Sequence, residues 1–132
     1  MKVLFVCEGN MMRSQMGEAF YNHLTGSTDA VSAGAAAAVG RDVPEAIVES
    51  MKEKGISMAG MTGKQVTRDM VDDADVVIAF PTPHMPKSII EDIKTRLWDV
   101  SDPFYMPDDG TDHIVRARDR IEQRINTELI GK

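Results

Sequence analysis

The sequence predicts an α/β fold, a three-layer sandwich in which a four-stranded parallel sheet carries helices on both faces. Short apolar runs rich in β-branched residues alternate along the chain with segments whose apolar residues recur at helical spacing. Such alternation is typical of parallel strands joined by right-handed crossovers. The chain has 132 residues and contains no internal repeat or linker, so we expect a single domain over residues 1–132.

The first half of the chain contains two expected strands and two expected helices. They are a strand at Lys2–Val6, a helix at Arg13–Leu24, a strand at Val31–Ala33 and a helix from Pro44 to just before Gly55. The first strand is short, apolar and β-branched, and a polar turn ends it. In the first helix, Met16, Ala19 and Phe20 share one face, and Gly26 follows as a stop signal.

The second half of the chain continues the alternation. Its expected elements are a short helical turn at Val66–Val71, a strand at Ala74–Phe80, a helix after Pro86 through Ile93, a strand at Thr95–Trp98 and a final helix at Thr111–Leu129. Thr67 is expected to cap the helical turn. The inward stripe of the final helix is expected to be Ile114, Ala117, Ile121, Ile125 and Leu129.

Composition and charge exclude several classes of protein. No apolar run approaches the ~20 residues of a membrane span, and residues 1–6 are too short for a signal sequence, so we expect a cytoplasmic protein without a membrane partner. Fifteen basic and 21 acidic residues give a net charge of −6, which argues against a nucleic-acid partner. An anionic substrate remains compatible with this charge, because a local cluster of donors can reverse the field in a pocket.

Cysteine and histidine usage also restricts the chemistry. The single cysteine, Cys7, excludes an intrachain disulfide and a cysteine-rich zinc site. His23, His84 and His113 are far apart and show no metal-ligand spacing. We therefore expect surface or partly buried histidines and no metal or other cofactor.

The segment Cys7–Ser14 joins the first strand to the first helix, where ligands bind in open α/β sheets. Successive backbone N–H groups and the positive end of the helix favour an oxyanion there, and Arg13 can add a bidentate fork. The same dipoles favour the thiolate form of Cys7, which predicts a nucleophile to which Ser14 can donate a hydrogen bond. The expected substrate-binding residues of this phosphate-binding loop are Glu8, Gly9, Asn10, Met11, Met12 and Ser14.

A candidate acid follows the fourth predicted strand, at the same edge of the sheet. Breaking a phosphoester requires a proton for the leaving oxygen, and Asp102 is placed to supply it. The aromatic pair that follows Pro103, Phe104 and Tyr105, can form a wall of the pocket, so Tyr105 is a further substrate-binding candidate. Several acids lie nearby, of which only one can be the proton donor: Asp99, Asp108, Asp109 and Asp112.

Together, Cys7–Ser14 and Asp102-Pro103 resemble the low-molecular-weight protein tyrosine phosphatase family, whose scaffold is shared by thiol-dependent arsenate reductases. The resemblance covers nearly the whole chain. It implies that Cys7 takes up the phosphoryl group, that Arg13 and the loop amides bind it, and that Asp102 protonates the leaving group and then activates water. It also implies that Asn10 and Ser14 hold the loop, with Ser32 as a partner of Asn10.

Four features of the sequence bear on the branch of the family to which the chain belongs. Met12 stands where many of the phosphatases carry a second cysteine, and Glu8 where an apolar residue is usual. The carboxylate of Glu8 is expected to repel a dianion or to favour a particular substrate. The run Gln15–Ala19 is similar to the arsenate reductases, but Phe80–Pro83 carries none of their further cysteines, so reduction of arsenate would need an external thiol.

We therefore hold three hypotheses. The first is a phosphomonoester hydrolase, a protein tyrosine phosphatase that forms a cysteinyl-phosphate and acts as a monomer or weak dimer on a phosphorylated protein. The second is an arsenate reductase that takes a small oxyanion substrate and an external thiol. The third is a module that binds an oxyanion without catalysis.

Overall fold

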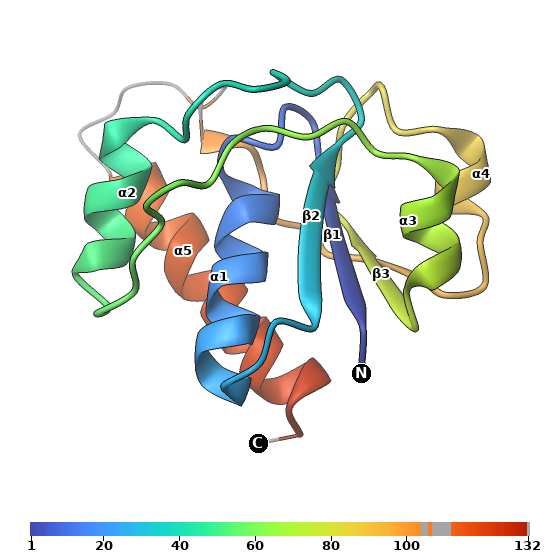
Figure 1. Ribbon diagram of the computed structural model, residues 1–132. Helices are drawn as coiled ribbons and strands as arrows, with labels where there is room; N and C mark the ends of the chain where they lie inside the picture. The colour runs from blue at the N-terminus through green and yellow to red at the C-terminus, as the bar shows by residue number, and fades with distance from the viewer. Residues whose placement is uncertain (104–105, 107–111, 132) are drawn as a thin grey trace.

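The sheet has four parallel strands, as the sequence predicts. The computed structural model of the protein describes residues 1–103, 106 and 112–131. The strands are β1 (Val3–Cys7), β2 (Ala30–Gly34), β3 (Val76–Ala79) and β4 (Thr95–Leu97). Their order in the sheet is β2-β1-β3-β4, so β1 is paired on both sides and places Cys7 opposite Gly34 (Figure 1).

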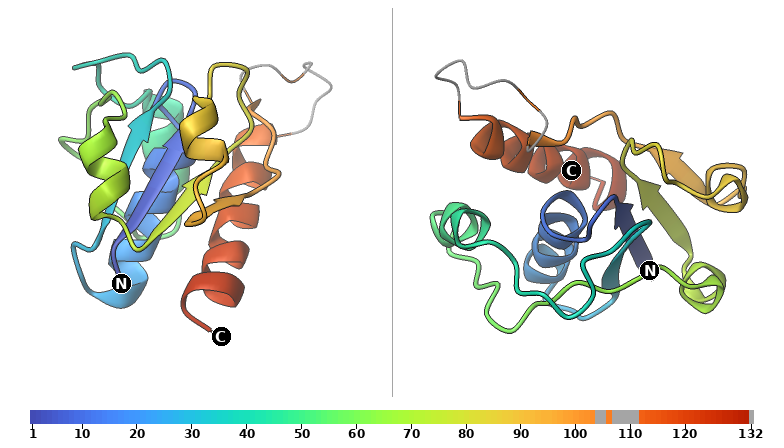
Figure 2. Two further views of the ribbon diagram at one scale, coloured as in Figure 1. Left: turned by 90° about the vertical axis from the view of Figure 1, so that its right-hand side faces the viewer. Right: turned by 90° about the horizontal axis from the view of Figure 1, so that it is seen from above.

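Helices cover both faces of the sheet, which confirms the three-layer arrangement. They are α1 (Arg13–Thr25), α2 (Glu45–Lys52), α3 (Arg68–Asp73), α4 (Lys87–Ile90) and α5 (His113–Arg124), which continues into the π-helical turn η2 (Ile125–Leu129). One face carries α1, α2 and α5, and the other carries α3 and α4 (Figure 2). Within the described residues, no helix is long and apolar enough to cross a membrane.

Two apolar cores follow from the alternation of side chains along β1. Phe5 faces the core under α1, α2 and α5, where its ring meets the fully buried Trp98 edge-on at a centroid distance of 6.1 Å. Leu4 and Val6 face a smaller core under α3 and α4. Each large side chain buried in this way contributes about 1.5–3 kcal/mol relative to its exposed state. β1 is therefore held from both faces as well as from both edges.

Most expected elements appear within a residue or two of their predicted ends. Thr67 caps α3, since its hydroxyl accepts the N–H of Met70 at 3.3 Å. The helix expected to run through Ile93 is an exception: α4 ends at Ile90, and the Ile93 side chain is 99% exposed. The side chain of Asp92 accepts the backbone N–H of Lys94 at 2.9 Å, and this local turn replaces the next helical hydrogen bonds.

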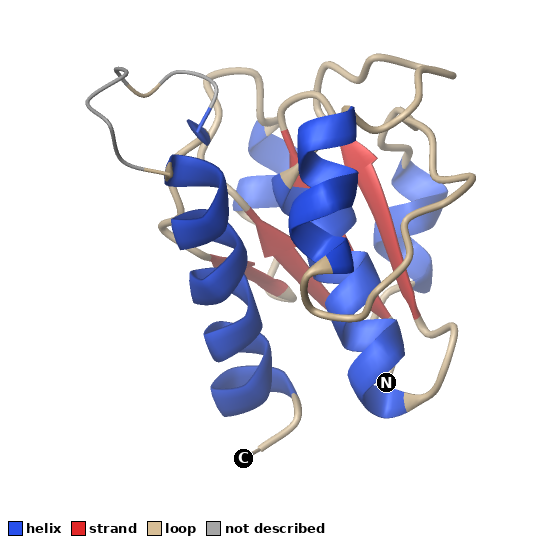
Figure 3. Ribbon diagram, turned by 90° about the vertical axis from the view of Figure 1, so that its left-hand side faces the viewer, coloured by secondary structure: helices blue, strands red, loops and turns tan. Residues whose placement is uncertain are grey.

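The connections that leave the carboxyl ends of the strands gather at one end of the sheet (Figure 3). These are the segments after Cys7, after Gly34, after Ala79 and after Leu97. Both ends of the chain lie at the opposite end of the sheet (Figure 1). The topology thus brings the loop after β1 next to the segments that follow β3 and β4.

Candidate active site

The loop from Glu8 to Met12 turns tightly between β1 and α1. The carbonyl oxygens of Cys7 and Glu8 accept the N–H groups of Ala35 and Ala36, each at 2.8 Å. Because a trans peptide directs its N–H away from its C=O, the N–H groups of Glu8 and Gly9 point to the other side of the loop. At Gly34, a Cβ would lie 2.8 Å from the Glu8 carbonyl oxygen, so only glycine allows this close approach.

The sulfur of Cys7 lies at the base of this loop and is almost fully buried. Its Sγ is 2.9 Å from the Oγ of Ser14. Asn10 Nδ2 donates to the same Oγ at 2.7 Å, so the Ser14 hydroxyl links the loop asparagine to the sulfur. α1 begins at Arg13 and adds the positive end of its dipole. The sulfur therefore lies next to a hydroxyl group and near the N-terminus of a helix.

Asn10 organises the loop from within. Its backbone is left-handed at φ 57°, which asparagine tolerates better than most residues. Besides Ser14, its amide nitrogen donates to the Ser32 hydroxyl at 3.0 Å, which confirms Ser32 as the expected partner. Its Oδ1 accepts the backbone N–H of Lys64 at 2.8 Å and the side chain of Gln15 at 3.1 Å. The buried amide is therefore fully hydrogen-bonded, and this fixes the shape of the loop.

Arg13 is buried to 2% exposure and joins three segments. Its Nη1 donates to the carbonyl oxygens of Pro81 at 3.0 Å and Val100 at 2.9 Å. Its Nη2 lies 3.5 Å from Asp102 Oδ2, and its guanidinium lies 5.7 Å from the centre of the Phe80 ring. Since a guanidinium has five N–H groups, Nε and one N–H of Nη2 are left for an oxyanion. Nε and Nη2 are therefore placed to form the fork expected from the sequence, while Nη1 anchors the side chain to the Pro81 and Val100 carbonyls.

Asp102 shares a cavity of about 190 Å³ with Cys7 and Arg13. The loop residues Gly9, Met11 and Met12 also line this cavity. Of the alternative acids, Asp112 caps α5 by accepting the N–H of Val115, and Asp99 lines other cavities. Asp108, Asp109 and the aromatic candidates Phe104 and Tyr105 lie outside the described residues.

Glu8 has partners that the sequence did not indicate. Its carboxylate accepts the hydroxyl of Thr82 and lies 2.7 Å from Nδ1 of His84. The hydrogen bond from Thr82 holds the pKa of Glu8 below its usual range, and the hydrogen bond and charge of His84 and the charge of Arg13 act in the same direction, against the effect of burial. The His84 side chain is 61% exposed, in agreement with the expected surface position, and its contact with Glu8 places it at the mouth of the site.

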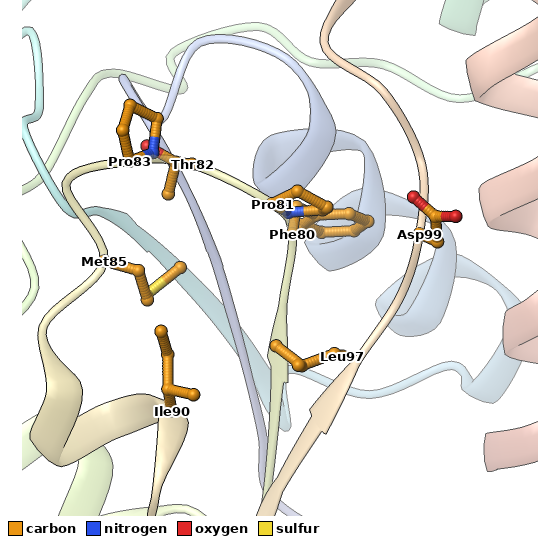
Figure 4. A pocket seen from close by; sticks show the side chains of 8 residues that line it. All are labelled: Phe80, Pro81, Thr82, Pro83, Met85, Ile90, Leu97 and Asp99. Carbon is orange, nitrogen blue, oxygen red and sulfur yellow. The ribbon is translucent and has the colours of Figure 1, made fainter.

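A second cavity, of about 380 Å³, lies at this mouth and is lined by Glu8, Arg13, Asp102 and the segment Pro81–His84. Beyond that segment is a larger apolar hollow of about 640 Å³, which shares Pro81, Thr82 and Pro83 with it. Figure 4 shows Met85, Ile90 and Leu97 around this hollow. The part of the chain that the structure describes contains no group of three or more histidine, cysteine or acidic side chains able to hold a metal ion.

The fold and this site define a class of α/β proteins that place a cysteine beneath a tight loop of backbone N–H groups, at the carboxyl edge of a parallel sheet. Within that class, the chain belongs to the low molecular weight phosphotyrosine protein phosphatase family, whose sequence model matches residues 2–130. The family includes arsenate reductases as well as phosphatases.

Individual relatives come from both branches. The low molecular weight protein-tyrosine-phosphatase YfkJ of Bacillus subtilis is 34% identical over 127 residues, covering 78% of this chain and 80% of its own. The glutaredoxin arsenate reductase of Synechocystis is 36% identical over 140 residues, covering 99% and 97%. Among solved structures, a low molecular weight protein tyrosine phosphatase from T. tengcongensis superimposes with a TM-score of 0.82 at 26% identity, covering 100% of this chain and 99% of that one.

Proposed function

We propose that this protein is a phosphomonoester hydrolase that acts on phosphotyrosine in proteins through a cysteinyl-phosphate on Cys7. The observation that supports this most directly is the cavity of about 190 Å³ that Cys7, Arg13 and Asp102 line together. A nucleophile, an oxyanion-binding cation and a carboxyl group on one cavity are the groups that the reaction needs.

In the proposed first step, the Cys7 thiolate attacks phosphorus, and the bond to the leaving oxygen breaks as Asp102 gives that oxygen its proton. Arg13 and the loop N–H groups hold the three equatorial oxygens. In the second step, the Asp102 carboxylate takes a proton from water, the water oxygen attacks phosphorus, and the bond to sulfur breaks. Phosphate leaves, and the thiolate and the protonated carboxyl are restored.

A long, flat leaving group suits the depth of this site. Cys7 is only 3% exposed, so a short phosphorylated side chain reaches its sulfur less easily than tyrosine does. The nucleophile must also be a reduced thiol, and the cytoplasm is the compartment that keeps thiols reduced. We therefore propose a cytoplasmic protein with a phosphotyrosine substrate.

Hydrolysis of para-nitrophenyl phosphate tests the nucleophile. We expect turnover that persists in EDTA and disappears in the Cys7→Ser variant, because a serine hydroxyl at this position lacks a base to deprotonate it. Turnover in Cys7→Ser at the wild-type rate would contradict the assignment. Binding of phosphate without turnover by wild type would instead favour a module that only binds oxyanions.

Asp102→Asn tests the proton donor. The variant should lower the rate by about 10²-fold or more with phenyl phosphate, whose leaving group needs a proton, and far less with para-nitrophenyl phosphate. The comparison uses single-turnover rates of the two substrates. Equal slowing of both would exclude Asp102 as general acid and leave it as a partner of Arg13.

Arsenate reduction is a second candidate function, and the likeness to the glutaredoxin arsenate reductase favours it. Arsenate fits the same oxyanion loop, but Cys7 is the only cysteine of the chain. Two external thiols would therefore supply both electrons, releasing arsenite and water and leaving one disulfide. Oxidation of glutathione and glutaredoxin that depends on arsenate, without phosphatase activity, would select this function.

A further inference from the structure

The mouth of the site places the carboxylate of Glu8 beside the position proposed for the phosphate. The charged side chains that line the cavity of about 380 Å³ are the carboxylates of Glu8 and Asp102, the guanidinium of Arg13 and the imidazole of His84. Arg13 is already paired with Asp102 at 3.5 Å. An incoming phosphate dianion thus meets the carboxylate of Glu8 as well as the guanidinium of Arg13.

The side chain of Glu8 is held in place in its ionised form. The hydroxyl of Thr82 donates to one carboxylate oxygen, and Nδ1 of His84 lies 2.7 Å from the other. Prolines on both sides of Thr82 restrict the backbone that presents this hydroxyl. A carboxylate that is fixed and charged beside a phosphate site is costly unless a cation meets it.

We propose that Glu8 is a specificity residue that binds a lysine or arginine side chain next to the phosphorylated residue of the substrate. This inference rests on the proposed phosphatase function. A basic neighbour compensates for the charge that Glu8 adds to the mouth, so the substrate brings both the dianion and its counter-charge. Arg13 takes the phosphate, and Glu8 takes the cation.

His84 occupies the position that this cation would take. Its ring is 61% exposed and its contact with the Glu8 carboxylate is an edge contact through one nitrogen, so it can swing away without disturbing a core. Thr82 keeps Glu8 in place when the ring leaves, because it bonds the other oxygen. His84 thus competes with the basic side chain of the substrate for the Glu8 carboxylate. Removal of His84 should therefore strengthen the preference for a basic neighbour, and removal of Glu8 should abolish it.

Three phosphotyrosine peptides test this, identical except that lysine, alanine or glutamate flanks the phosphotyrosine on both sides. We expect the wild-type kcat/KM to be about fivefold higher for the lysine peptide than for the alanine peptide, as for a partly exposed ion pair, and lower still for the glutamate peptide. In Glu8→Gln the lysine-to-alanine ratio should fall to about one, and in His84→Ala it should rise above the wild-type ratio. Asp73→Asn, an exposed carboxylate just before β3 at the opposite end of the sheet, is the matched control and should keep the wild-type ratio.

Binding of the same peptides to Cys7→Ser, alone and combined with Glu8→Gln, separates this inference from the proposed function. Absence of turnover in wild type would overturn the phosphatase proposal, while the ratio of Kd values in the Cys7→Ser background would still report on Glu8. A lysine preference that persists in Glu8→Gln would overturn the inference. An equal gain in kcat/KM for all three peptides in Glu8→Gln, relative to wild type, would also overturn the inference, since Glu8 would then only repel phosphate.

Discussion

The inner and outer halves of the site are built in different ways. The inner half, Cys7, Asn10, Arg13 and Ser14, is exposed by 3% or less, and its polar groups are hydrogen-bonded to one another, to backbone or to neighbouring side chains. In the outer half, Glu8, Thr82, His84 and Asp102, the side-chain exposure is 19% for Glu8, 18% for Asp102 and 61% for His84.

Asp102, the proposed proton donor, takes part in the chemistry although it lies in the outer half. For the other residues, this difference separates chemistry from selection. A buried network has one arrangement, because every unpaired polar group in it is costly, and it therefore holds the proposed nucleophile and the proposed oxyanion donors in one geometry. The outer residues are solvated and can change partners at low cost. Changes to the inner half should thus affect every substrate and the stability of the fold, whereas changes to the outer half should discriminate between substrates.

Apart from the loss of turnover in Cys7→Ser, the largest effect on activity is expected from Arg13→Lys. A lysine ammonium cannot bond both Pro81 and Val100 carbonyls and still present two parallel donors to an oxyanion. We expect kcat/KM for para-nitrophenyl phosphate to fall by about 10²–10³-fold, and unfolding in urea to show a loss of about 1–3 kcal/mol from the unpaired buried groups. Loss of activity with unchanged stability would show that the hydrogen bonds of Arg13 to Pro81 and Val100 do not stabilise the fold.

Asn10 gives a prediction about stability that separates side chain from backbone. Asn10→Gly removes the side-chain hydrogen bonds but tolerates the left-handed backbone, and should cost about 2–3 kcal/mol of unfolding free energy. Asn10→Ala removes the same bonds and adds strain, about 1 kcal/mol more. Equal losses in the two variants would mean that the loop relaxes out of its left-handed turn.

The smallest effect is expected in the outer half and concerns pH. The pKa of Glu8 is lower in the folded protein than in the unfolded chain, so its contribution to stability is fully present above the unfolded value, roughly 4.3, and is lost as pH falls through the folded value. The difference in unfolding free energy between wild type and Glu8→Gln should therefore be constant near neutral pH and shrink in acid. A difference that grows on acidification would contradict the hydrogen-bonded, ionised state of Glu8.

The inner half could be predicted from the sequence because its pattern is largely local. Cys7, Asn10, Arg13 and Ser14 lie within one strand–loop–helix segment, and the types of these residues indicate their chemistry. Ser32 came from the family resemblance and not from spacing. The strands and the two helical faces followed from periodicity, and α4 was overextended because the apolar Ile93 concealed the turn that Asp92 makes.

The remaining contacts could not be predicted, for two physical reasons. Arg13 and Asn10 use the backbone groups of Pro81, Val100 and Lys64, and backbone groups carry no signature in the residue type. Glu8 meets His84 across 76 residues, a contact that depends on the crossing from β1 to β3 and on the bend at the prolines. The sequence predicts His84 only as a surface residue and does not indicate its contact with Glu8.

The central position of β1 has a consequence for how the protein loses activity. All five residues of β1 are buried and the strand is paired on both sides, so its amide protons should exchange with solvent only when the whole molecule unfolds. Cys7 is the last residue of this strand. The sulfur of Cys7, the proposed nucleophile, is thus attached to the part of the protein expected to exchange most slowly. Heating should therefore displace this sulfur only when the whole molecule unfolds.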